Sequence, residues 1–170
     1  DSPYVDWFEI EGWPLRPYAS TANKPCNYAA WHGIPALPEF NTDNPEVQTF
    51  LLDVAEHWIN FGIDGWRLDV PDEIDDPPFW RKFRDIVKTA NPEAYLVGEI
   101  WDEAPAWVGG DRFDALMNYP LLDPTLSFFG AGSLRDYSKA HLTFKPMDAE
   151  AFADEVNDLL ALCDWEVTCA

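Results

Sequence analysis

The chain has 170 residues, of which 47% are hydrophobic and 15% aromatic, so it can form a sizeable core. Its 31 acidic and 11 basic residues give a formal charge of −20, which argues against nucleic acid as a partner because phosphates would be repelled. No apolar run approaches the length of a membrane span, about eighteen residues, and no basic and then apolar leader is present. The three cysteines, Cys26, Cys163 and Cys169, lack metal-ligand spacing, and their odd number favours a reducing compartment, which predicts a cytoplasmic protein.

Residues 1–43 are dense in proline and in aromatic side chains. Proline at this density prevents long helices, while the aromatic rings favour burial. This region is therefore predicted to be an irregular packed loop with one short hairpin around Phe8 to Trp13. We assign residues 1–43 to a first domain and residues 44–170 to a second.

Two helices are predicted from the same start signal, a capping residue followed by proline. The signal at Asn44-Pro45-Glu46 predicts a helix that ends at Gly62, with apolar residues three and four positions apart on one side. The signal at Asp76-Pro77-Pro78 predicts a second helix, which stops before Asn91-Pro92. Two further helices are predicted, a short one from Asp123-Pro124 to Gly130 and an amphipathic one over residues 148–163.

Three short apolar runs alternate with these helices and are predicted to be strands: Ile63 to Asp69, Ala94 to Trp101, and Phe113 to Asn118. Helices that alternate with strands in this way are typical of parallel βα units, whose crossovers are right-handed. A sheet of three parallel strands has two open edges and cannot cover both of its faces well. The predicted fold class is therefore α/β, as a section of a barrel.

Two of the predicted strands lead into a carboxylate, the first at Asp69 and the second at Glu99. Residues two apart in a strand share a face, so Arg67 and Asp69 point the same way. If the strands are parallel neighbours, Asp69 and Glu99 emerge together at the carboxyl edge of the sheet, where α/β enzymes hold their catalytic groups. Taken singly, such a carboxylate is more often a turn cap, and an arginine two residues before it is more often its salt-bridge partner.

Four motifs, in order and at matching spacing, resemble those of the α-amylase family of glycoside hydrolases, which are TIM (β/α)8 barrels. Gly65-Trp66-Arg67-Leu68-Asp69 resembles the strand-four motif, and Gly98-Glu99-Ile100-Trp101 resembles the strand-five motif. With Leu37-Pro38-Glu39-Phe40-Asn41 and Met117-Asn118-Tyr119, the chain is most similar to the neopullulanase, cyclomaltodextrinase and maltogenic amylase group. The resemblance implies a partial barrel that covers about strands 4 to 6 with their helices. It also implies that residues 1–43 are the end of an inserted loop domain.

The resemblance implies that Asp69 is the nucleophile, Glu99 the general acid/base and Arg67 the residue that holds Asp69 ionised and oriented. The spacing of strands agrees with these roles. Adjacent strands lie about 4.8 Å apart, and retaining glycosidases hold their two carboxyl groups about 5 to 5.5 Å apart. Arg67 should lower the pKa of Asp69 and so keep it ionised to attack. The retaining mechanism needs the other carboxyl group protonated to donate.

Substrate contacts are expected from Trp101 and Tyr119, because aromatic faces suit the apolar faces of sugar rings. Ordinary core packing stays open as the alternative for both. The resemblance implies further contacts at Glu73, near the acceptor side, and at Asn118. The three histidines are scattered, so no metal site and no cofactor are expected.

The implied function is retaining hydrolysis of α-1,4 and also α-1,6 links in an α-glucan oligosaccharide, cyclodextrin, pullulan or starch. The family motifs with Asn-His on strand three and His-Asp on strand seven have no counterpart, since neither dipeptide occurs in the sequence. The chain is therefore predicted to be a fragment that is poorly active or inactive alone. The alternative is a non-catalytic piece that binds glucan or completes a barrel with a partner, including a copy of itself paired through open strand edges.

Overall fold

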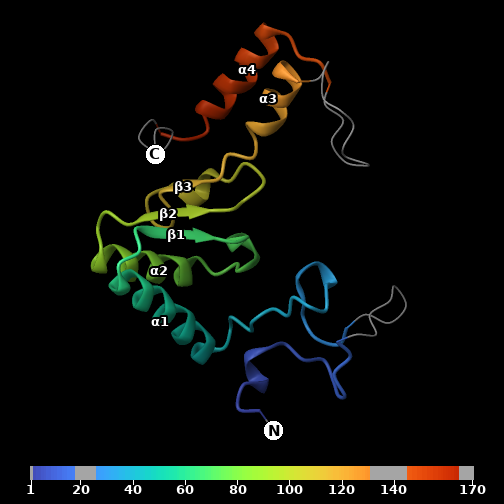
Figure 1. The fold of residues 1–170 in the computed structure, drawn as a ribbon, viewed down its shortest axis with the longest axis vertical. Helices are drawn as coiled ribbons and strands as arrows, with labels where there is room; N and C mark the ends of the chain where they lie inside the picture. The colour runs from blue at the N-terminus through green and yellow to red at the C-terminus, as the bar shows by residue number, and fades with distance from the viewer. Residues whose placement is uncertain (1, 18–25, 131–144, 165–170) are drawn as a thin grey trace. The chain divides into compact units, whose positions relative to one another are not determined.

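The computed structural model describes residues 2–17, 26–130 and 145–164 (Figure 1); Cys169 lies outside them. The chain divides into two compact units, Asp1–Trp58 and Ile59–Ala170, and each is described by itself. The predicted domain boundary after residue 43 stays a prediction. Among the described residues, no helix is long and apolar enough to cross a membrane.

The first unit contains irregular chain with two short 3-10 turns, Val5–Trp7 and Trp31–Gly33, as the density of proline predicted. The predicted hairpin around Phe8 to Trp13 is wrong. Phe8 forms an antiparallel bridge with Phe40, and Ile10 forms one with Tyr28, so the partners come from much later in the chain. The reason is that the segment after Trp13 contains prolines, which lack the N–H that a returning strand must donate.

Both helices predicted from a cap and a proline are confirmed. Helix α1, Pro45–Phe61, follows Asn44, whose side-chain oxygen accepts a hydrogen bond from the Glu46 amide at 2.9 Å. It ends at Gly62, whose φ of 111° lies in the region that favours glycine. Helix α2, Pro77–Ala90, follows Asp76, whose carboxylate accepts from the Phe79 amide at 3.2 Å.

The second unit contains a three-stranded parallel sheet in the order β1-β2-β3 (Figure 1). The strands are β1, Gly65–Leu68, β2, Tyr95–Gly98, and β3, Ala115–Leu116. The three predicted strands are confirmed, although each is shorter than its apolar run. Gly65 pairs with Tyr95 and Leu68 with Gly98, while Val97 pairs with Ala115, so the sheet brings the ends of all three strands to one edge.

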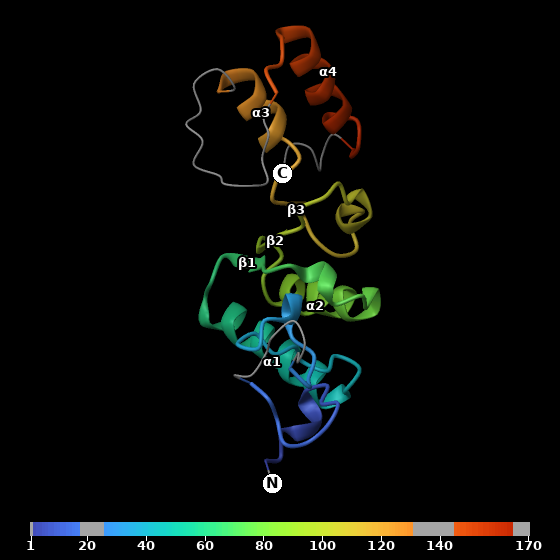
Figure 2. The same cartoon turned by 90° about the vertical axis from the view of Figure 1, so that its right-hand side faces the viewer.

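The two faces of this sheet differ in burial. Leu96 and Gly98 of β2 are buried, whereas Tyr95 on the opposite face is 40% exposed. The buried face packs on α2, where the rings of Trp66 and Phe83 meet at 6.0 Å between centroids. Figure 2 shows α2 beside the strands on this side. An aromatic cluster of Trp80, Phe83, Trp107 and Phe113 completes this core.

Two more helices follow the sheet. Helix α3, Leu122–Phe129, begins one residue before the predicted start at Asp123, and Asp123 is an acid in its first turn and not its cap. Helix α4, Ala149–Leu160, is capped by Asp148, which accepts from the Ala151 amide at 2.9 Å. Phe152 of α4 stacks on Phe128 of α3 at 4.7 Å between ring centroids, so these two helices pack together.

The pairing of β1 with β2 requires glycine at position 65. A Cβ there would overlap the backbone carbonyl of Tyr95. Gly65→Ala is therefore expected to destabilise the chain by about 3 kcal/mol, because backbone atoms must move apart. Urea unfolding measures the change, with Gly109→Ala as the matched control, since a Cβ at Gly109 meets its nearest atom at 3.9 Å. Equal unfolding midpoints for the two variants would contradict the expectation.

Candidate active site

The two carboxylates predicted to meet are placed together by the register of β1 on β2. Asp69 follows Leu68 and Glu99 follows Gly98, and Leu68 and Gly98 are the last paired residues of the two strands. The amide of Glu99 donates to the carbonyl of Leu68 at 2.9 Å, which continues the pairing by one step. The carboxylates therefore leave the same edge of the sheet from neighbouring strands.

A single guanidinium group joins the two carboxylates. Nη1 of Arg67 pairs with Oδ1 of Asp69, and Nη2 of Arg67 lies 2.6 Å from Oε2 of Glu99. Arginine suits this position because its donors form a rigid planar fork that stays charged. The side chain of Glu99 is only 12% exposed, whereas that of Asp69 is 77% exposed. The cluster thus holds one enclosed carboxyl group and one that is open to a reactant.

The contacts of Asp69 favour its ionised form. The hydrogen bond from Arg67 lowers the pKa of Asp69, against a smaller opposing effect of desolvation, and a hydrogen bond with Glu99 and the charge of Arg67 lower it further. In return, the hydrogen bond to Asp69 raises the pKa of Arg67. Asp69 is therefore a carboxylate at neutral pH, which is the form that a nucleophile needs.

Tyr119 occupies the other side of Glu99. Its hydroxyl donates a hydrogen bond to Oε1 of Glu99 at 2.7 Å, so both oxygens of Glu99 have a partner. This hydrogen bond raises the pKa of Tyr119, together with desolvation and the negative charge of Glu99. The sequence indicated a sugar contact for Tyr119 and gave no sign of this bond. A usable signal was the position of Tyr119 just beyond β3, the strand next to β2.

The backbone turns sharply directly after Asp69. Val70 has φ 34° and ψ 57°, in the left-handed region, which is rare for a β-branched residue. This turn leads into the 3-10 turn Pro71–Glu73 and ends the strand. Strained backbone is often found at functional sites, and here it adjoins the more exposed carboxylate.

Comparison with known proteins decides the family. The family model described as the α-amylase catalytic domain matches residues 21–167 of the chain. The chain belongs to the α-amylase family. A cyclomaltodextrinase from Geobacillus thermopakistaniensis (strain MAS1) is 46% identical over 160 residues, which are 94% of this chain and 24% of that relative. Neopullulanase 2 from Thermoactinomyces vulgaris is 46% identical over 134 residues, which are 78% of this chain and 22% of that relative.

A solved debranching enzyme from Nostoc punctiforme superimposes with a TM-score of 0.84 and 47% sequence identity, over 98% of this chain and 34% of that one. These matches confirm the predicted fold class, a section of an α-amylase family barrel, and the predicted likeness to cyclomaltodextrinases and neopullulanases. The chain spans about a quarter of the length of the two curated relatives.

Three further residues expected to contact substrate lie on three different segments of the second unit. Trp101 follows the buried Ile100 and is 50% exposed. Glu73 is exposed at the end of its 3-10 turn. Asn118 is exposed, and its side-chain oxygen accepts from the Leu121 amide at 3.2 Å, which stabilises the turn before α3. Their roles as substrate contacts stay predictions.

The second unit contains a cavity of about 330 Å³. Its lining includes Val108 of the 3-10 turn Pro105–Val108, Met117 after β3 and Leu159 of α4, and neither Asp69 nor Glu99 is among the lining residues. Within the described parts of the chain, no group of three or more histidine, cysteine, aspartate or glutamate side chains is arranged to hold a metal ion.

Removing the guanidinium should change the titration of its carboxylate. Arg67→Gln is expected to raise the pKa of Asp69 toward its ordinary value of about 3.9, because the largest cause of the depression is the hydrogen bond from Arg67. Carboxyl carbon NMR over an acid titration measures this pKa. Arg81→Gln is the matched control, since Arg81 pairs with Asp111 at 2.7 Å and should leave Asp69 unchanged. An Asp69 pKa that is the same in wild type and Arg67→Gln would show that the hydrogen bond from Arg67 does not lower it.

Proposed function

We propose that the chain supplies the nucleophile and the general acid/base of a retaining glycoside hydrolase that acts on α-glucans. The observation that carries the proposal is the position of Arg67 between Asp69 and Glu99 at the carboxyl ends of neighbouring strands. The names of the relatives, cyclomaltodextrinase and neopullulanase 2, support cyclodextrins, pullulan and related glucans as the substrate class. We also propose a cytoplasmic location, as the cysteine content predicts.

In the first step, a carboxylate oxygen of Asp69 attacks the anomeric carbon while Glu99 gives its proton to the glycosidic oxygen. The bond between that carbon and the leaving glucan breaks, and a covalent glycosyl ester forms on Asp69. In the second step, water attacks the anomeric carbon, Glu99 takes a proton from the water, and Asp69 is released. Two inversions at one carbon leave its configuration retained.

The surroundings of the two carboxyl groups suit these different tasks. Asp69 is exposed and held ionised by Arg67, so it can reach a sugar. Glu99 is enclosed, and Arg67 and Tyr119 contact its two oxygens, which fixes the orientation of its carboxyl group. A carboxyl group that is fixed in orientation transfers a proton more effectively than one that rotates freely.

We propose that the substrate contacts come from Trp101, Glu73, Asn118 and Tyr119. The side chain of Trp101, two residues after Glu99, is half exposed and has an apolar face on which a pyranose ring can stack. The exposed carboxylate of Glu73, four residues after Asp69, provides hydrogen-bond acceptors for sugar hydroxyl groups. Glu73 and Trp101 come within four residues after Asp69 and Glu99, respectively, which supports a location at the same edge of the sheet.

A chimera tests the catalytic roles. The matching 160 residues of the Geobacillus cyclomaltodextrinase are replaced by this chain, and hydrolysis of β-cyclodextrin is measured. The chimera is expected to be active, and Asp69→Asn and Glu99→Gln are each expected to lower kcat by about 10⁴-fold or more, because each removes a group that acts in the transition state.

Asp111→Asn in the same chimera is the control, because Asp111 forms a surface ion pair with Arg81. Its kcat should stay within about threefold of the unsubstituted chimera, as expected for an exposed pair. An active chimera that tolerates Asp69→Asn would overturn the role of Asp69 as nucleophile.

The 170-residue chain by itself is expected to release reducing sugar from β-cyclodextrin at less than about one-thousandth of the rate of the chimera. The sequence contains no His-Asp dipeptide, so it lacks the strand-seven motif whose carboxylate the resemblance assigns to stabilising the transition state. A reducing-sugar assay of the purified chain checks this. Robust hydrolysis that Asp69→Asn abolishes would show the expectation to be wrong.

The second candidate function is a non-catalytic piece that binds glucan or associates with a partner. It is favoured by β1 and β3, which are the edges of the described sheet, and by the exposed rings of Phe61 and Phe129. Titration calorimetry with β-cyclodextrin and light scattering over a range of concentrations separate the two. An inactive chimera, together with glucan binding or self-association by the chain, would favour this second function.

A further inference from the structure

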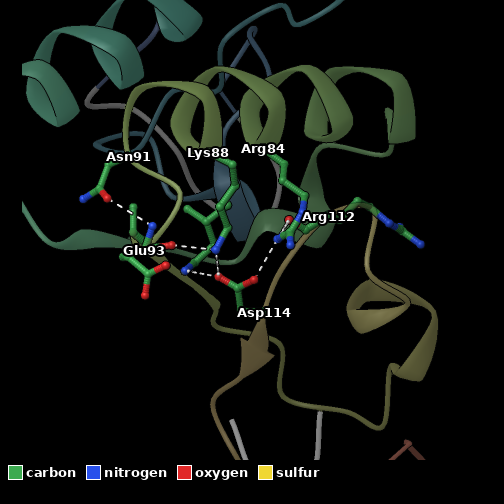
Figure 3. Close-up of polar contacts among 8 residues, drawn as sticks. Arg84, Lys88, Asn91, Glu93, Arg112 and Asp114 are labelled. Carbon is green, nitrogen blue, oxygen red and sulfur yellow. Dashed lines mark hydrogen bonds and ion pairs between the residues drawn. The ribbon is translucent and has the colours of Figure 1, made fainter. Parts of the chain in front are cut away.

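The side chain of Asp114, directly before β3, receives hydrogen bonds from two other elements (Figure 3). Oδ2 of Asp114 accepts from Nζ of Lys88 at 2.7 Å and from the backbone amide of Leu96 at 2.9 Å. Oδ1 accepts from Nη1 of Arg84 at 2.9 Å. Arg84 and Lys88 belong to α2 and Leu96 belongs to β2, so one carboxylate joins three segments. We call these four residues the Asp114 clamp.

The clamp extends a very short strand. Strand β3 has two residues, and they pair with Val97 and Gly98 of β2. One step earlier, the amide of Asp114 donates to the carbonyl of Leu96 at 2.9 Å, and the amide of Leu96 donates to the carboxylate of Asp114. Both backbone groups of Leu96 are therefore bonded to the same residue. The carboxylate supplies the acceptor that a longer strand would have supplied from its backbone.

The two cations of the clamp also bind the segments that lead into β2 and β3. Arg84 and Lys88 are four residues apart, so they lie on one side of the helix. Nη1 of Arg84 donates to the carbonyl of Arg112 at 3.2 Å, and Nζ of Lys88 donates to the carbonyl of Ala94 at 2.7 Å. The segments that lead into β2 and β3 are thus both fixed to α2 at this point.

The carboxylate of Asp114 is largely enclosed, with 17% of its side chain exposed. Burial would raise the pKa of Asp114, but the hydrogen bonds from Lys88, the Leu96 amide and Arg84 outweigh burial and hold the pKa below its ordinary value. An enclosed carboxylate with these partners is costly to replace, since a neutral side chain removes the negative charge that offsets two nearby cations.

The clamp and the contact between Tyr119 and Glu99 lie at opposite ends of the same pair of strands. Glu99 is three residues after Leu96, and Tyr119 is five residues after Asp114. The register of β3 on β2 decides whether the Tyr119 hydroxyl reaches Glu99, because a shift of one residue turns every side chain to the other face.

We propose that Asp114 is a positioning residue of the site: by fixing the register of β3 on β2, it places the Tyr119 hydroxyl on Glu99. Its importance for catalysis rests on the proposed function, but the placement itself does not. Asp114 touches neither carboxylate of the site, and it acts through β3. Loss of the Asp114 carboxylate is therefore expected to weaken the hydrogen bond from Tyr119 to Glu99.

Two NMR measurements on Asp114→Asn in the 170-residue chain test the proposal. Hydrogen exchange of the Leu96 amide reports the clamp, and it is expected to become about tenfold faster or more, since a charged acceptor is lost. Titration of the Tyr119 ring, followed at its oxygen-bearing carbon, reports the hydrogen bond from Tyr119 to Glu99. The pKa of Tyr119 is expected to fall toward its ordinary value of about 10, because the bond to Glu99 that raises it is lost.

Tyr95 does not serve as the readout, because burial and the charge of Asp114 raise its pKa directly. Asp111→Asn is the matched control. Asp111 lies three residues before Asp114 and pairs with Arg81 of the same helix, but its side chain is 41% exposed. This control is expected to change neither the Leu96 exchange rate nor the pKa of Tyr119.

An unchanged Tyr119 pKa in folded Asp114→Asn, with faster Leu96 exchange, would overturn the proposal and leave Asp114 with a role in stability alone. A Leu96 amide that exchanges freely in the wild-type chain would overturn it as well. If Asp114→Asn does not fold, Lys88→Gln keeps the carboxylate and carries the same two readouts. Lys88→Gln should also speed exchange of the Leu96 amide and lower the pKa of Tyr119. If neither the exchange rate nor this pKa changes, the proposal is overturned. Neither measurement depends on hydrolysis, so an inactive chimera would overturn the catalytic roles without affecting this result.

Discussion

The parallel pairing of β1 with β2 is the constraint on which the site depends. The register that pairs Leu68 with Gly98 makes Asp69 and Glu99 the next residues on neighbouring strands. Two ionised carboxylates brought together in this way repel each other, and a cation between them offsets the repulsion. Arg67 comes from β1 itself, two residues before Asp69 and on the same face. The strand that creates the repulsion therefore also carries the group that offsets it.

The two carboxylates respond differently to this shared cation because their exposure differs. Asp69 is 77% exposed, so water screens it and its link to Arg67 contributes little to stability. Glu99 is 12% exposed and has far less access to water, so its hydrogen bonds from Arg67 and Tyr119 replace solvent that it has lost. The contact of Arg67 with Asp69 thus acts mainly on the ionisation of Asp69. The contacts of Arg67 and Tyr119 with Glu99 act mainly on the orientation of Glu99.

The features that sequence predicted are those set by residues close in the chain. The starts of α1 and α2 follow from Asn44 and Asp76, each of which caps a helix within three residues of itself. The pairing of Asp69 with Glu99 was predictable because both come at the end of an apolar run. The partner of Phe8 was not, because Phe40 lies far along the chain and nothing local selects it. The left-handed backbone of Val70 was hidden for a related reason, since β-branched residues disfavour that conformation and only the surrounding structure imposes it.

Strand β3 shows why contacts of this kind escape a reading of sequence. A strand of two residues has few backbone hydrogen bonds, so polar side chains at its ends must contribute to holding it in place. At one end the carboxylate of Asp114 accepts from β2 and α2, and at the other the hydroxyl of Tyr119 donates to Glu99. In the sequence these are an aspartate before a strand and a tyrosine after it, which are ordinary residues for a turn. Their contacts with Leu96 and Glu99 form only in one register of β3 on β2, and each contact in turn stabilises that register. The position of β3 and the hydrogen bonding of Glu99 therefore depend on the same register.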